Sequence, residues 1–167
     1  QQVADEIIAG FRESAKLANV KLTLESMNIN PWCIIGGIAS AVCSRDEIVF
    51  PTKAVAGDVL ILTKPLGVQL ATNAPIWMAE ENENWKKLNE FLTKEDINEA
   101  YATAIKSMTT LNHLGAKLMQ KYKANCATDV TGFGLVGHAE NLLIFQEAEL
   151  DFILNKMPII KHVKKMA

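Results

Sequence analysis

A chain of 167 residues is long enough to bury a core, and its net charge of −2 excludes the basic excess that a nucleic-acid-binding protein carries. With 49% hydrophobic and 22% charged residues, the composition is that of a globular domain rather than of a disordered or fibrous chain. No apolar run is long enough to cross a bilayer, so we do not expect the chain to span a membrane. Together with the net charge, this leads us to expect neither nucleic acid nor a membrane among the partners.

The first part of the chain carries one helical pattern followed by extended ones. Residues 3–18 predict a helix, because apolar side chains recur on one stripe. Extended segments at 20–26 and 30–43 follow, and the Gly36-Gly37 pair predicts a bulge in the second. The proline- and glycine-containing stretch 46–57 is the best candidate for a domain boundary.

The second part alternates between strands and helices. The β-branched run 59–63 predicts a buried strand. Thr93 and Asp96 form a capping-box pattern before a helix over 97–121, in which Gly115 is expected to make a kink and the apolar stripe to pack in the core. The other predicted elements are helices at 68–78, within 82–92, at 132–146 and at 159–166, and strands at 125–130 and 150–154. Because the predicted strands are short and interrupted, we expect an α+β fold, a layered mixed sheet with packed helices.

The three cysteines, Cys33, Cys43 and Cys126, share no metal-ligand spacing. Their neighbours are apolar, so we expect buried, reduced thiols. Reduced thiols in turn predict a reducing compartment, the cytoplasm.

The stretch "ATDVTGFGLVGHAENLL", residues 127–143, has three possible interpretations. Gly132, Gly134 and Gly137 have the spacing of a dinucleotide-binding loop, but the expected strand before them is short and polar. Alternatively, Asp129 supplies a metal ligand beside an anion site formed by the amides at the start of the helix. In the third interpretation, Asp129 or Thr131 caps the helix and the glycines only allow tight packing. The residues alone do not decide between the metal-ligand interpretation and the capping interpretation.

Two other polar side chains near these motifs have ordinary interpretations. His138, in the first turns of the helix, is expected to be packed or hydrogen-bonded rather than to act as a catalytic base. Lys64, which follows the predicted strand at 59–63, is expected to be a solvated turn residue rather than a phosphate ligand.

Four stretches together resemble selenophosphate synthetase (selenide, water dikinase), most closely the animal-type enzymes. They are "NPWCIIGGIAS", "AVAGDVLILTKPLG", "NCATDVTGFGLVGHAENL" and "DFILNKMPII", and they occur in the family's order over almost the whole chain. More loosely, they resemble the aminoimidazole ribonucleotide synthetase superfamily of ATP-using enzymes.

The resemblance implies a two-domain α+β architecture, usually dimeric. Residues 1–45 would end the amino-terminal ATP-binding-type domain, 46–57 would be the linker, and 58–167 would begin the carboxy-terminal domain. It also implies the synthesis of selenophosphate from ATP, selenide and water with Mg²⁺, releasing AMP and orthophosphate. Asp129 would be the family's magnesium-binding aspartate; the resemblance assigns no catalytic or nucleotide-binding residue to this chain.

Two departures from the family pattern predict limits on activity. The family's reactive Cys or selenocysteine, its Lys in a glycine-rich loop and further metal-binding aspartates lie upstream of the matching stretches. We therefore expect a segment of a longer protein that makes no selenophosphate by itself. Where the family has a Gly-Gly turn that contacts ATP, this chain has Leu24, Glu25, Ser26 and Met27. The alternative function is thus a catalytically impaired paralogue, acting as a regulator or as the partner in a homodimer or heterodimer.

Overall fold

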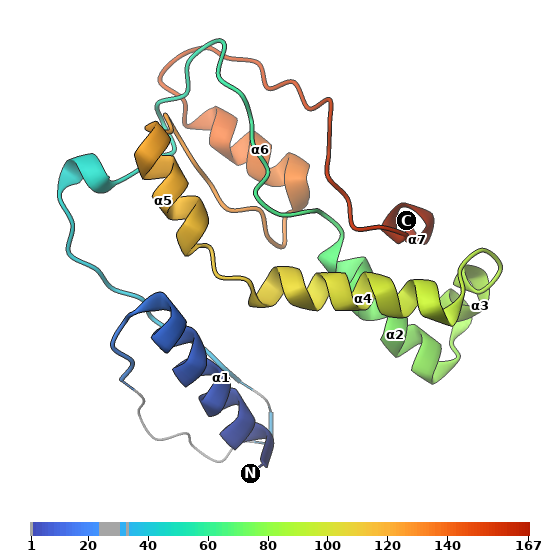
Figure 1. The fold of residues 1–167 in the computed structure, drawn as a ribbon. Helices are drawn as coiled ribbons and strands as arrows, with labels where there is room; N and C mark the ends of the chain where they lie inside the picture. The colour runs from blue at the N-terminus through green and yellow to red at the C-terminus, as the bar shows by residue number, and fades with distance from the viewer. Residues whose placement is uncertain (1, 24–30, 33) are drawn as a thin grey trace. The chain divides into compact units, whose positions relative to one another are not determined.

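The computed structural model describes residues 2–23, 31–32 and 34–167, which form two compact units, Gln1–Ile48 and Val49–Ala167 (Figure 1). The first unit holds the helix α1 (Gln2–Ala18) and the short 3-10 helix η1 (Arg45–Glu47). The helix predicted at 3–18 is therefore confirmed. No residue of α1 is buried, so the described part of this helix encloses no core.

The regular secondary structure of the second unit consists of helices. Its helices are α2 (Val68–Glu80), α3 (Glu83–Leu88), α4 (Lys94–Thr109), α5 (His113–Tyr122), α6 (Gly134–Ile144) and α7 (Val163–Met166). The predicted helices at 68–78 and 132–146 and the turns within 82–92 are confirmed. The helix predicted at 159–166 is shorter and begins at Val163.

The core of this unit lies where α2 meets α4, with α3 and α7 against them (Figure 1). Ala71 and Ala74 of α2 and Ala100 and Ala104 of α4 are fully buried, and side chains this small allow the two helices to approach closely. Larger apolar side chains close the cluster from the sides: Trp85, Leu88, Leu92, Ile97, Ile160, Val163 and Met166.

The start of α4 follows the predicted capping box. The Thr93 hydroxyl accepts the amide of Asp96 at 3.2 Å, and the Asp96 carboxylate accepts the amide of Thr93 at 3.0 Å. Two of the orphan amides at the helix start are thereby satisfied.

The prediction of a single helix over 97–121 is wrong, because α4 ends at Thr109 and a second helix, α5, starts at His113. The Thr110 hydroxyl donates to the Lys106 carbonyl at 2.7 Å, and Thr110 adopts an extended conformation. Such local side-chain bonds compete with helix continuation. Gly115, expected to make the kink, lies inside α5.

The apolar stripe of 97–121 packs only in part. Ile97 and Ala104 are fully buried as predicted. Four other members, Tyr101, Met108, Leu118 and Tyr122, are exposed, so the core interpretation is wrong for them.

The predicted layered mixed sheet is wrong: within 2–23, 31–32 and 34–167 the one β-bridge is an isolated parallel pair, Leu66 with Ile159. The segments 59–63 and 150–154 run extended without a ladder, and Val59, Ile61 and Ile153 are exposed. β-branched alternation favours an extended backbone, but a strand forms only when a neighbour supplies the facing amides and carbonyls. The described parts of 20–26, 30–43 and 125–130 form no ladder either.

Two sequence predictions fall on residues that the structure does not describe. The Leu24–Met27 turn lies outside the described residues, as does Cys33. The assignment of 1–45, 46–57 and 58–167 to two domains and a linker stays a prediction. Within the described ranges, no helix combines the length and apolar character needed to cross a membrane.

Candidate functional site

The glycine loop leads directly into α6. The amide of Gly134 donates to the Thr131 carbonyl at 3.0 Å, and Gly134 has φ +71, a conformation that glycine adopts without strain. A Cβ at Gly137 would lie 3.0 Å from the Cβ of Phe133, so this glycine permits the turn to pack on the helix. The described residues before the loop form no strand, so the dinucleotide interpretation has no structural support.

The capping interpretation of Asp129 and Thr131 is wrong. The N-cap of α6 is Phe133, and no side chain forms a capping hydrogen bond there. The Asp129 carboxylate instead accepts the Thr131 hydroxyl on Oδ2 at 3.2 Å, and its Oδ1 lies 3.5 Å from Nδ1 of His138. The first amides of α6 therefore have no side-chain cap, and the helix start keeps the positive end of its dipole.

His138 is buried and hydrogen-bonded, as predicted. It is 5% exposed and is the one buried polar residue among those described. Its Nε2 accepts the backbone amide of Thr131 at 2.9 Å, and its ring lies 5.6 Å from that of Phe133. An imidazole that accepts at Nε2 carries its proton on Nδ1, the nitrogen that faces Asp129.

A divalent cation fits the chemistry of Asp129 as one ligand of a larger set. The side chain of Asp129 is 68% exposed, so a metal could reach it without displacing protein. Each carboxylate oxygen has two lone pairs, and the contacts to Thr131 and His138 occupy at most one of each. Mg²⁺ is typically held by one or two carboxylates together with substrate phosphates. Asp129 meets that requirement in part, and among the described residues it belongs to no group of three or more potential metal ligands.

Lys64 is bonded rather than solvated. The side chain is half-buried and its Nζ donates to the carbonyl of Thr110 at 2.6 Å. It therefore ties the segment before α2 to the break between α4 and α5, and it satisfies a carbonyl at the end of α4.

The cysteine prediction is only partly right. Cys43 and Cys126 are free thiols, but Cys43 is exposed, not buried. Burial, and then the nearby charge of Asp58, raise the pKa of the Cys126 thiol. A raised pKa disfavours the thiolate, so Cys126 is a poor nucleophile.

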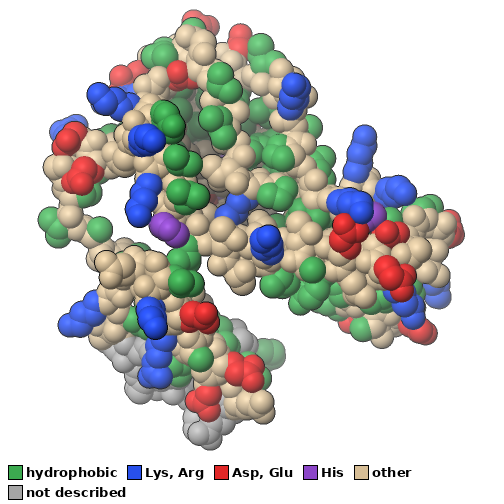
Figure 2. Space-filling model, viewed as in Figure 1, with side chains coloured by type: hydrophobic (Ala, Val, Ile, Leu, Met, Phe, Trp, Pro, Cys, Tyr) green, Lys and Arg blue, Asp and Glu red, His purple; other side chains and the backbone are tan. Residues whose placement is uncertain are grey.

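A second polar cluster, Asp96, Glu99 and His162, was missed by sequence reasoning. The Nε2 of His162 lies 3.0 Å from Glu99 Oε2 and 3.4 Å from Asp96 Oδ1, and Lys161 Nζ lies 2.9 Å from Glu99 Oε2. Charged side chains of both signs and a histidine gather at this end of the unit, over α3, α4 and α7 (Figure 2). No sequence signal could have revealed the cluster, because its two halves are more than 60 residues apart in the chain.

The cluster lowers the pKa values of its carboxyl groups. The amide of Thr93, and also the charge of His162, hold the pKa of Asp96 below its ordinary value. The hydrogen bond from Lys161, then that from His162, does the same for Glu99. Three potential metal ligands meet here, but Lys161 already neutralises Glu99, so we interpret the cluster as an ionic link between α4 and the start of α7.

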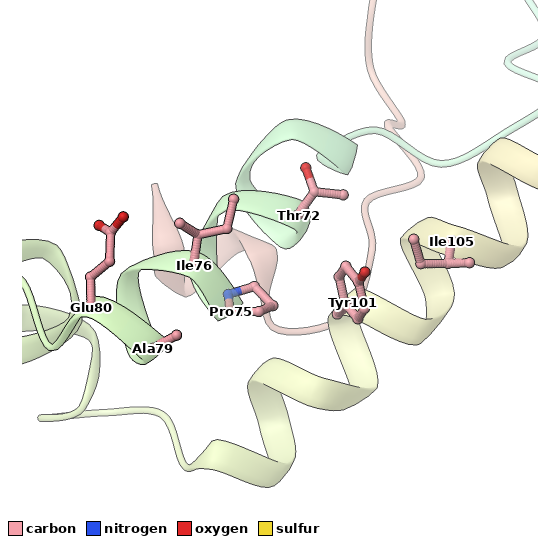
Figure 3. A pocket seen from close by; sticks show the side chains of 7 residues that line it. All are labelled: Thr72, Pro75, Ile76, Ala79, Glu80, Tyr101 and Ile105. Atoms are coloured by element: carbon pink, nitrogen blue, oxygen red, sulfur yellow. The ribbon is translucent and has the colours of Figure 1, made fainter. Parts of the chain in front are cut away.

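An apolar groove lies between α2 and α4. Figure 3 shows Thr72, Pro75, Ile76 and Ala79 of α2 on one side and Tyr101 and Ile105 of α4 on the other. Glu80 is its one charged lining residue. None of the groove's side chains belongs to the 127–138 motif, so the groove takes no part in the site at Asp129.

Comparisons with known proteins agree with these motifs. Residues 55–166 match the family model described as AIR synthase related protein, C-terminal domain. The chain is 50% identical over 164 residues to selenide, water dikinase 2 of Drosophila melanogaster, an alignment that covers 96% of this chain. The chain belongs to the selenophosphate synthetase family. The resemblance stated from the four motifs is thereby confirmed.

Other selenophosphate synthetases match over the same extent. Selenide, water dikinase 2 of Mus musculus and selenide, water dikinase of Dictyostelium discoideum are each 42% identical over 160 residues, 96% of this chain. The chain spans less than half of its relatives' lengths, 44% of the Drosophila, 35% of the mouse and 44% of the Dictyostelium protein. Each of these relatives bears the enzyme's name, so the comparisons do not favour the impaired-paralogue alternative.

Proposed function

We propose that the protein containing this chain makes selenophosphate from ATP, selenide and water and releases AMP and orthophosphate. Membership of the selenophosphate synthetase family supports the proposal, together with the exposed carboxylate of Asp129 beside the uncapped start of α6. The latter is the observation of this structure that carries it, since a metal ligand in contact with α6 and a helix start without a side-chain cap suit a metal-bound anion.

In this proposal, Asp129 holds Mg²⁺ and the start of α6 lies beside a phosphate. The ion, when bound, neutralises phosphate charge and orients the nucleotide for phosphoryl transfer. The protein's own contribution is positional: the turn at Gly134 leads into α6, and His138 of that helix lies 3.5 Å from the Asp129 carboxylate. Thr131 donates its hydroxyl to Oδ2 of Asp129, which limits the rotation of the carboxylate.

The partners and the location follow from the same proposal. ATP and selenide are the substrates, and a homodimer or a heterodimer with a paralogue is the expected assembly. Reduced thiols at Cys43 and Cys126 fit a cytoplasmic location.

The test is selenide-dependent AMP formation by the full-length protein, with the selenophosphate product identified by its phosphorus resonance. The proposal expects AMP and selenophosphate to appear in equal amounts only when ATP, selenide and Mg²⁺ are all present. ATP hydrolysis that is indifferent to selenide, or no turnover at all, would overturn it. A mass measurement in solution, with and without a co-expressed paralogue, decides the assembly.

A further inference from the structure

We propose that His138 is a positioning residue that directs the Asp129 carboxylate toward a divalent cation. The proposal rests on the proposed function, since it takes Asp129 to be a metal ligand. Its basis is the bridge that one buried imidazole makes between the Thr131 amide and the Asp129 carboxylate.

The buried ring is held from its Nε2 side. The Thr131 amide donates to Nε2 at 2.9 Å, and this bond uses the single lone pair that a neutral imidazole offers. Burial at 5% exposure and the ring of Phe133 at 5.6 Å hold the imidazole in place. The ring therefore has a fixed orientation, in which the proton is on Nδ1 and this nitrogen lies 3.5 Å from Oδ1 of Asp129.

The other contacts around Asp129 agree with a proton on Nδ1, rather than on Nε2, of His138. The Thr131 hydroxyl lies 3.2 Å from both His138 Nε2 and Asp129 Oδ2. Since the backbone amide already occupies Nε2, the hydroxyl proton goes to Oδ2, the charged acceptor. The two oxygens of Asp129 are then approached by two different donors, Thr131 Oγ1 on Oδ2 and His138 Nδ1 on Oδ1.

A carboxylate held from two sides loses little freedom when a metal binds. Asp129 is 68% exposed, so without these contacts its side chain would be free to rotate in solvent. The distance of 3.5 Å from Nδ1 to Oδ1 is that of a close contact rather than of a formed hydrogen bond, and such contacts often tighten when a site is filled. Loss of a hydrogen-bonding partner behind a metal ligand typically weakens metal affinity about 10–100-fold.

Two substitutions separate the two ends of the imidazole. In His138→Asn, the side-chain amide nitrogen is one bond beyond Cγ, as Nδ1 is, so a donor toward Asp129 remains while the Nε2 acceptor is lost. In His138→Gln, the amide oxygen is two bonds beyond Cγ, as Nε2 is, so the acceptor for the Thr131 amide remains while the donor at the position of Nδ1 is lost. A purely structural histidine would be replaced better by Gln, whereas a histidine that positions Asp129 would be replaced better by Asn.

The experiment is calorimetric titration of the full-length variants with Mn²⁺, alongside thermal unfolding and hydrogen exchange of residues 127–134. We expect His138→Gln to weaken Mn²⁺ binding by about tenfold or more while the Thr131 amide stays protected. We expect His138→Asn to bind within about threefold of the unchanged protein, although the Thr131 amide exchanges faster. Equal binding by His138→Gln and the unchanged protein, or losses that follow thermal stability in both variants, would overturn the proposal.

Two further measurements keep the test decisive. In an Asp129→Asn background, His138→Gln should have no further effect on Mn²⁺ binding, because the two residues act through one carboxylate. If Asp129→Asn itself leaves Mn²⁺ affinity unchanged, both this proposal and the proposed metal site fail. If only His138→Gln has no effect, the positioning role alone fails. Should the variants not fold, the nitrogen-15 resonances of His138 in the unchanged protein report the tautomer, and a proton on Nε2 contradicts the proposal.

Discussion

The closest packing around a glycine in the second unit occurs at Gly67, and it predicts a large effect of adding one methyl group. Gly67 precedes α2 and has φ +104, and a Cβ built there would lie 2.5 Å from Cγ1 of Val163. Val163 is buried in the core cluster, and its β-branched side chain has little rotational freedom to move away.

Gly67→Ala therefore combines two costs, and Gly57→Ala isolates one of them. Gly57 has nearly the same backbone angle, φ +96, but a Cβ there meets nothing within 4 Å. A left-handed conformation costs an L-residue about 1–2 kcal/mol, which is the effect expected for Gly57→Ala. Overpacking adds about 1–3 kcal/mol, so Gly67→Ala should lower the free energy of unfolding by about 2–5 kcal/mol in total.

The assay is urea unfolding of the full-length variants followed by tryptophan fluorescence. Trp85 lies buried in the same cluster as Val163, so its fluorescence reports on the unfolding of that cluster. Val163→Ala in the Gly67→Ala background removes the methyl groups at 2.5 and 3.3 Å, so the double variant should lose less stability than the sum of the two single ones. If Gly67→Ala is no less stable than Gly57→Ala, the close approach to Val163 does not determine the packing and the reasoning is refuted.

Three further predictions follow from other features of the two units. Gln146 accepts the amide of Ala54 at 2.8 Å and donates to two backbone carbonyls, so Gln146→Glu, which removes the donor, should cost about 1–3 kcal/mol in urea unfolding; an unchanged midpoint would contradict this anchoring of α6. Because Cys43 is exposed whereas burial raises the pKa of Cys126, an alkylating reagent should modify Cys43 first, as mapped by mass spectrometry, and equal rates would count against the described burial. The folded-state pKa values of Asp96 and Glu99 lie below their ordinary values, so their stabilising contribution is present above those ordinary values and is lost as the pH falls through the folded-state ones. Unfolding temperatures measured from pH 6 to about pH 2 should therefore depend less on pH in an Asp96→Asn, Glu99→Gln variant, and parallel curves would exclude the ionic link.

The helices were predictable because their signals are local. Apolar spacing located α1, and the Thr93–Asp96 pair located the start of α4. The predicted helices at 68–78 and 132–146 also match α2 and α6. The end of α4 was not predictable, since hydroxyl bonds around Thr110 stop the helix without any proline or glycine at the break.

The sheet was wrongly predicted because strand pairing is not local. The run 59–63 has the composition of a buried strand, yet it is extended and its Val59 and Ile61 are exposed. Composition describes what a segment prefers when a partner strand is present, but it carries no information on whether one is there.

The candidate site was partly predictable. The sequence identified Asp129 as the residue of interest and predicted that His138 is packed, but it left open whether Asp129 caps α6. Only the structure shows that Phe133 holds the N-cap position and that Asp129 contacts Thr131 and His138 instead. The side-chain directions in a short glycine-containing turn depend on backbone angles, such as φ +71 at Gly134, that no sequence pattern specifies.

The most direct test of the central claim, that Asp129 is a metal ligand, is the affinity of the full-length Asp129→Asn variant for Mg²⁺–ATP. Asparagine keeps the volume of the side chain and an oxygen that can accept the Thr131 hydroxyl, but it removes the charge that Mg²⁺ requires. The account predicts at least about tenfold weaker binding by calorimetry with an almost unchanged unfolding temperature. Unchanged affinity together with a clear loss of thermal stability would contradict it, because Asp129 would then serve only to hold the turn before α6.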